Sequence, residues 1–157
     1  MQKAININVT DYKIFNGRNV GKIIIYENKE KVKEYDLSQL IFDGEYLNNK
    51  RNGKGKGFNN GYVLFEGEYL NGERSGKGKE YNKNTLIFEG EYLNGKRWNG
   101  KRYDEFRNIV YELNDGKGLV KEYDNNGDLI FEGEYLNGER NGKGKEYSND
   151  KLIFEGE

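Results

Sequence analysis

Charged residues alternate with aromatic or small residues over short stretches of the chain, and turn signals separate these stretches. In residues 65–69 the order is Phe-Glu-Gly-Glu-Tyr, which is the period-two pattern of a β-strand. Asn71-Gly72 follows, and this dipeptide is the strongest short-range signal for a two-residue hairpin turn. The pattern predicts one strand that ends at this turn and a second that runs back antiparallel to it.

The hairpin pattern recurs along the chain with a period of 23 residues in most units. Repeats of this length are typical of arrays in which each unit packs on its neighbours. We divide the repeat region, residues 42–157, into the units 42–64, 65–87, 88–110, 111–130 and 131–153 and a partial unit, 154–157; unit 111–130 diverges most.

The two ends of the chain differ from the repeats. Residues 23–41 form a degenerate unit, because Val32-Lys33-Glu34-Tyr35 echoes Val120-Lys121-Glu122-Tyr123. We expect residues 1–22 to form capping strands, with Asn16-Gly17 turning a hairpin that places Phe15 by Arg18, since the ends of repeat arrays need a modified unit. A strand for a partner or for self-association is the alternative. The incomplete last unit predicts a truncated chain or an edge strand that pairs with another copy.

Counting outward from the Asn71-Gly72 turn predicts which residues face each other. Tyr69 then faces Arg74, while the neighbouring pairs are Gly67 with Gly76, Phe65 with Gly78, and Glu66 with Lys77 on the other face. The same count pairs Phe131, Gly133 and Tyr135 with Gly144, Gly142 and Arg140, and Phe42 and Tyr46 with Gly55 and Arg51. Aromatic rings would lie over bare glycine backbone, which offsets the weakness of glycine in a strand.

Composition supports a thin, all-β fold. The 157 residues include 22 Gly, 13 Tyr and 8 Phe but no Pro, and Ala4 is the only alanine. A helical bundle is excluded, because alanine is the best helix former and glycine a poor one. Only 34% of residues are hydrophobic and the mean hydropathy is −1.07. We therefore predict an elongated single-layer antiparallel β-meander of repeated hairpins.

These hairpins resemble the MORN (membrane occupation and recognition nexus) repeat, aromatic-x-Gly-x-aromatic-x-Asn-Gly-x-x-x-Gly-x-Gly. The pattern stands here as Phe65, Gly67, Tyr69, Asn71, Gly72, Gly76 and Gly78, and again as Phe131, Gly133, Tyr135, Asn137, Gly138, Gly142 and Gly144. The recurring Phe-Glu-Gly-Glu-Tyr-Leu-Asn-Gly string is similar to MORN-variant repeats. Asn49 replaces the turn glycine of one unit, and Trp98-Asn99-Gly100 shifts a second-strand glycine by one place.

The chain lacks the residues that most enzyme chemistry uses. Without His or Cys there is no imidazole base, thiol nucleophile or usual zinc ligand set. The Gly-Lys string at 72–77 has the wrong spacing for a phosphate loop, and residues 124–128 misplace the glycine of a calcium loop. We predict no enzymatic activity, no cofactor and no metal. A net charge of −1 also gives no pull toward nucleic acid.

The resemblance implies a non-enzymatic scaffold that binds a protein partner, a peptide or a helix, through an aromatic-lined face or groove. The candidate partner-binding residues are Tyr46, Tyr69, Tyr92, Trp98 and Tyr135. Their alternative role is packing alone, with Trp98 covering a bulge. A phosphoinositide or membrane-surface module is the second hypothesis, which the charge balance disfavours, and the recognition arm of a larger multidomain protein is the third. We expect a cytoplasmic location, at the cytoskeleton or membrane periphery.

Overall fold

The computed structural model describes residues 6–15, 18–26, 30–124 and 126–157, and within these ranges it contains strands and turns but no helix. The first ten strands are β1 (Asn6–Phe15), β2 (Arg18–Tyr26), β3 (Lys31–Asp36), β4 (Gln39–Leu47), β5 (Lys50–Asn59), β6 (Tyr62–Leu70), β7 (Glu73–Asn82), β8 (Thr85–Leu93), β9 (Lys96–Tyr103) and β10 (Ile109–Leu113). The last four are β11 (Gly118–Tyr123), β12 (Leu129–Leu136), β13 (Glu139–Ser148) and β14 (Lys151–Gly156).

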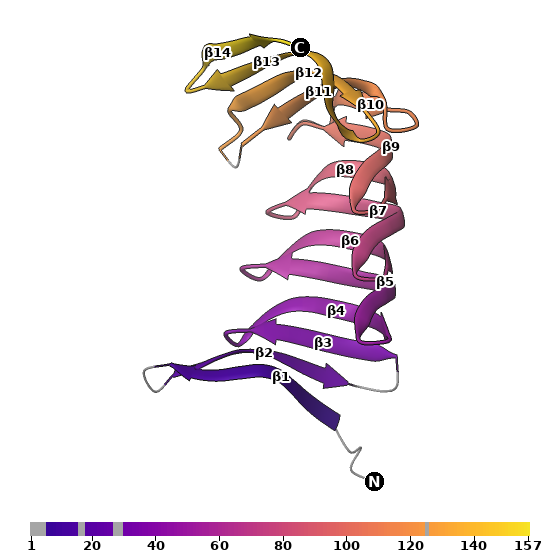
Figure 1. Ribbon diagram of the computed structural model, residues 1–157, viewed down its shortest axis with the longest axis vertical. Helices are drawn as coiled ribbons and strands as arrows, with labels where there is room; N and C mark the ends of the chain where they lie inside the picture. The colour runs from indigo at the N-terminus through magenta and orange to yellow at the C-terminus, as the bar shows by residue number, and fades with distance from the viewer. Residues whose placement is uncertain (1–5, 16–17, 27–29, 125) are drawn as a thin grey trace.

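Within each of two sheets, strands that are consecutive in the sequence pair antiparallel, which confirms the meander of consecutive hairpins. The molecule is an elongated stack of hairpins, with β1 at one end and β14 at the other (Figure 1). The hydrogen-bonded ladder is not continuous, because β1–β10 form one sheet and β11–β14 a second. The interruption falls in the divergent unit 111–130, where a single bridge, Asn114 with Lys117, closes the turn between β10 and β11.

The predicted hairpin register is confirmed beside the turn but is wrong farther from it. Tyr69 faces Arg74 as predicted, but Gly67 faces Gly78 and Phe65 faces Glu80, a shift of two positions. The same shift occurs in the hairpins β4–β5 and β12–β13, so that Phe42 faces Gly57, not Gly55, and Phe131 faces Glu146, not Gly144. Gly133 likewise faces Gly144 rather than Gly142, while Tyr46–Arg51 and Tyr135–Arg140 pair as predicted.

A bulge at Gly76 causes this shift. Gly76 has a φ of +64°, a left-handed conformation that glycine adopts without steric cost. A Cβ at this position would stand 2.3 Å from the Glu68 carboxylate, so any larger residue would have to displace that side chain and adopt a strained backbone conformation. In the hairpin β12–β13 the equivalent carboxylate, that of Glu134, accepts a hydrogen bond from the backbone N–H of Lys143 in the bulge at 3.2 Å. The same bulge interrupts the hairpins β4–β5, β6–β7 and β12–β13 near their turns. Figure 1 shows the hairpins bent along the stack.

The rings still cover glycine, although diagonally rather than directly across the ladder. A Cβ on Gly78 would lie 2.4 Å from Cζ of Phe65, and one on Gly67 would lie 2.7 Å from the same atom. Phe131 stands over Gly133 and Gly144 in the same way. These rings form the middle of the core, with Phe65 only 1% exposed. The buried residues Ile24, Val32, Tyr111, Leu113 and Val120 belong to the same core.

Turn geometry fixes the spacing of the hairpins. Asn71 and Gly72 both have positive φ, 54° and 98°, as the predicted two-residue turn requires. The Gly72 N–H then donates to the Arg51 carbonyl of the preceding hairpin at 2.8 Å, and Gly95 binds Arg74 in the same way at 3.0 Å. Each turn is thereby tied to the previous unit, which sets the repeat distance along the stack.

At the N-terminal end, β1 and β2 pair along their length, with Phe15 opposite Arg18 as predicted. The turn predicted at Asn16-Gly17 lies outside the described residues. β2 runs through the boundary placed between residues 22 and 23. The capping role of residues 1–22 and the division into units stay predictions.

Candidate functional site

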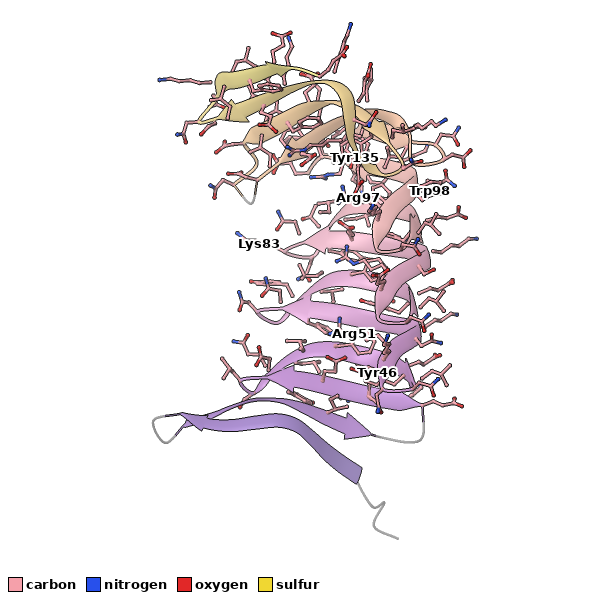
Figure 2. The ribbon with its side chains drawn as sticks, in the orientation of Figure 1. Tyr46, Arg51, Lys83, Arg97, Trp98 and Tyr135 are labelled. Carbon is pink, nitrogen blue, oxygen red and sulfur yellow. The ribbon has the colours of Figure 1, made fainter. Side chains whose placement is uncertain are left out.

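The candidate tyrosines lie on one face of the sheet, beside the phenylalanines of the repeats. We call this surface the ring face; it consists of Phe42, Tyr46, Phe65, Tyr69, Phe88, Tyr92, Phe131 and Tyr135. Tyr46, Tyr69 and Tyr92 are buried, and Tyr135 is half-buried. Figure 2 shows Tyr46 low in the stack and Tyr135 in the second sheet. Burial means that a partner meets the rings only where their edges and hydroxyls reach the surface.

The rings contact each other across the repeat boundaries. Phe65 lies edge-on to Tyr69 of its own strand, with centroids 5.3 Å apart, and to Tyr92 of the next repeat, at 5.1 Å. Phe42 likewise meets Tyr69 at 5.2 Å. Edge-to-face pairs of this kind are favourable beyond their buried area. The ring face is therefore one continuous row through the larger sheet.

An arginine covers each phenylalanine of the ring face. The four guanidinium carbons lie 4.2–4.7 Å from the ring centroids below them. We call these residues the arginine row; they are Arg51 over Phe42, Arg74 over Phe65, Arg97 over Phe88 and Arg140 over Phe131. Their side chains keep 27–41% of their surface exposed. The guanidinium groups thus form the outermost layer of the ring face and reach water.

Glutamates on the ring face join the arginines to the tyrosines, and sequence reasoning missed them. We call these residues the bridging glutamates; they are Glu34, Glu80 and Glu122. Each accepts from a tyrosine hydroxyl and from Nε and Nη2 of an arginine. The signal was available, since a Glu-Tyr dipeptide recurs on the second strand at 34–35, 80–81, 122–123 and 146–147.

Glu80 binds two arginines and a tyrosine. Its Oε1 accepts from Arg74 Nη1 at 2.7 Å and from the Tyr92 hydroxyl at 3.0 Å, while Arg97 binds both carboxylate oxygens. Burial acts to raise the pKa of Glu80, but Arg97, Arg74 and Tyr92 stabilise the carboxylate and hold the pKa below its usual value. Burial and the adjacent Glu80 raise the pKa of Tyr92. The group stays an ion network at neutral pH.

Trp98 lies apart from the tyrosine row, where β9 leads toward the second sheet (Figure 2). Its carbonyl accepts a hydrogen bond from the Gly116 N–H at 2.8 Å. Its half-buried ring covers Gly116, because a Cβ there would stand 2.8 Å from Cζ3 of the indole. Trp98 therefore contacts the turn between the two sheets, and its role as a partner-binding residue stays a prediction.

The opposite face carries lysines paired with glutamates. Glu66 pairs with Lys56 of the preceding strand at 3.1 Å rather than with the predicted Lys77, because the bulge shifts the register. Four more pairs have the same form: Lys79–Glu89, Lys101–Glu112, Lys121–Glu132 and Lys145–Glu155. These lysines are therefore neutralised, and exposed pairs of this kind contribute little to stability.

Other kinds of site are not found in the described ranges. No group of three or more His, Cys, Asp and Glu side chains there is placed to hold a metal ion. The same residues include no helix long and apolar enough to cross a membrane.

Comparison with known proteins agrees with this geometry. The family model of the MORN repeat matches residues 42–56, 65–85 and 131–152. These stretches coincide with the hairpins β4–β5, β6–β7 and β12–β13. No curated protein matches the chain. Three family matches in register with one recurring aromatic-glycine hairpin show that the chain is a MORN repeat protein.

Proposed function

We propose that this protein is a non-enzymatic scaffold that binds a protein partner along the ring face. MORN repeats are commonly interaction repeats for proteins or membranes and are not known as enzymes. The arginine row carries the proposal. Its guanidinium groups recur once per hairpin, are held over rings by glutamates, and stay 27–41% exposed.

Preorganisation is the physical reason that such a row suits binding. Arginine loses side-chain entropy when a partner immobilises it, but here stacking on a ring and pairing with a glutamate already fix each side chain. Arginine and aromatic residues are also enriched at binding hot spots. The candidate tyrosines belong to this proposal as the rings and hydroxyls under the arginine row.

The paired lysines of the opposite face argue against a phosphoinositide reader. Such readers act through clusters of uncompensated basic residues, whereas Lys56 and its equivalents pair with glutamates. A cytoplasmic location, at the cytoskeleton or the membrane periphery, is part of the same proposal and follows from the family resemblance.

A double variant on each face tests the proposal. Affinity purification identifies a partner, and the dissociation constant of the purified pair is then measured. We expect Arg51→Gln/Arg74→Gln to weaken binding at least tenfold, because the variant loses two of the four guanidinium groups of the arginine row. Lys56→Gln/Lys79→Gln removes the same charge from the other face and should change binding less than twofold. Equal effects of the two variants would refute the ring face as the interface, and saturable binding to phosphoinositide vesicles at moderate salt would support the lipid reader instead.

A further inference from the structure

One position of the ring face lacks its bridging glutamate. Gly57 pairs with Phe42 on one side and Phe65 on the other, while Glu80 holds the matching place between Phe65 and Phe88. The substitution is visible in the sequence, where Lys-Gly-Phe at 56–58 replaces the Lys-Glu-Tyr of 79–81. We call this position the Gly57 gap.

The hydroxyl of Tyr69 is left without the acceptor that its equivalents have. Tyr46 and Tyr92 each donate to the glutamate 12 residues before them, but the residue 12 before Tyr69 is Gly57. Tyr69 is only 6% exposed, and its hydroxyl has no hydrogen-bond partner in the part of the chain that the structure describes. The hydroxyl is aimed into the gap, because a Cβ on Gly57 would stand 3.2 Å from it.

Arg74 is left with an unused pair of donors at the same place. Nε and Nη2 of Arg51 bind the glutamate 17 residues earlier, and Arg97 binds Glu80 at the same spacing. For Arg74 that position is Gly57. Its Nη1 turns to Glu80 at 2.7 Å instead, and its Nε and Nη2 have no partner among the described residues.

These groups line an open pocket of about 260 Å³. Arg51, Gly57, Phe65, Tyr69 and Arg74 are among the residues that line it. From Glu34 to Arg97 the network contains three arginines and two bridging glutamates, so the arginines outnumber the carboxylates by one. The group that would complete the network at Gly57 is a carboxylate, as at the equivalent positions Glu34 and Glu80.

We propose that the Gly57 gap binds a carboxylate that an acidic side chain of a protein partner supplies. The Nε and Nη2 atoms of arginine form a planar fork that matches the two oxygens of a carboxylate. The chain itself shows that this combination of fork, hydroxyl and flanking ring holds a carboxylate, at Glu34, Glu80 and Glu122. The source of the carboxylate rests on the proposed function, while the site rests on the contacts above.

Peptide probes test the site in the free protein, without the natural partner. The probes are acetyl-Gly-Glu-Gly-amide, its Gln counterpart, and inorganic phosphate at matched ionic strength. Binding is followed at the Arg74 Nε–H resonance by NMR. We expect a saturable shift with the Glu peptide and at least tenfold weaker binding of the Gln peptide, because charge-assisted hydrogen bonds are lost.

Two variants of equal charge localise the binding. Gly57→Glu fills the gap with a tethered carboxylate, and it fits because its Cβ meets only the Tyr69 hydroxyl. We expect it to abolish the shift and to move the free Arg74 resonance toward the bound position. Asn59→Glu adds the same charge on β5 at a residue that does not line the pocket, and it should leave binding within twofold of wild type.

Several outcomes would overturn this assignment. These are equal binding of the Glu and Gln peptides, no saturable shift at all, or retained binding in a folded Gly57→Glu variant. Saturable binding of phosphate without binding of the Glu peptide would assign the gap to a phosphate group instead. Because the probes do not depend on the partner, these outcomes are independent of whether the arginine row proves to be the interface for the whole protein.

Discussion

Replacing Glu80 by glutamine tests whether the bridging glutamates hold the repeats together. The side chain keeps its size but loses the charge that Arg74 and Arg97 share, and both guanidinium groups then face a neutral amide. Breaking a buried ion pair by neutralising one partner costs about 3–5 kcal/mol. Glu80 is 13% exposed and its arginines 27–32%, so solvent screening reduces this to about 2–3 kcal/mol.

Glu146 supplies a matched control, because it faces Phe131 as Glu80 faces Phe65. Its side chain is 42% exposed, and among the described residues it forms an ion pair with Arg140 alone, at 2.8 Å. An exposed pair of this kind contributes about 0.5 kcal/mol. We therefore expect Glu146→Gln to lower the free energy of unfolding several-fold less than Glu80→Gln does.

Urea unfolding of the two variants measures the difference, with far-ultraviolet circular dichroism and Trp98 fluorescence as probes. Repeat arrays can unfold in parts, so the two probes are compared before a free energy is extracted. Equal losses in Glu80→Gln and Glu146→Gln would refute the reasoning, since burial and the second arginine are the features that distinguish them.

The pH dependence of the same pair follows from the lowered pKa of Glu80. A carboxyl group with a lowered pKa stabilises the fold fully above its unfolded pKa, about 4.3, and this contribution is lost as the pH falls through the folded pKa. The stability difference between wild type and Glu80→Gln should therefore be constant near neutral pH and shrink below about pH 4. A difference that persists unchanged into strong acid would contradict an ionised Glu80.

Three further substitutions probe the packing. Gly78→Ala should destabilise the fold by about 2 kcal/mol, because its Cβ would enter the ring of the buried Phe65. Gly57→Ala, whose Cβ meets only the Tyr69 hydroxyl, should change stability by less than about 1 kcal/mol. Equal effects of the two variants in urea unfolding would argue against packing of the rings on glycine. Trp98→Ala should speed hydrogen exchange in β11–β14 more than in β5–β8, because the indole covers Gly116 between the two sheets. An equal increase along the whole stack would show that this contact does not couple the two sheets.

Much of the candidate site was readable from the sequence, but its chemistry was not. The rings, the glycines and the Tyr69–Arg74 pair follow from alternation and turn position, which are local properties. The role of Glu80 depends on Arg97, which is 17 residues away and on another hairpin. Strand alternation does not predict contacts between hairpins, because these depend on how the bent units stack.

The sequence by itself determined an all-β array of hairpins, its recurring aromatic and glycine positions and the Asn-Gly turns at 71–72 and 137–138. These follow from period-two alternation and from Asn-Gly pairs, whose conformational preferences act over a few residues. Only the tertiary structure decided the register beyond Gly76, because the left-handed conformation of this glycine makes a bulge opposite Glu68 that strand alternation does not predict. It also decided that the ladder breaks between β10 and β11. The absence of a glutamate at Gly57 leaves Arg74 and the Tyr69 hydroxyl facing an open pocket, because this position lies where neighbouring hairpins meet.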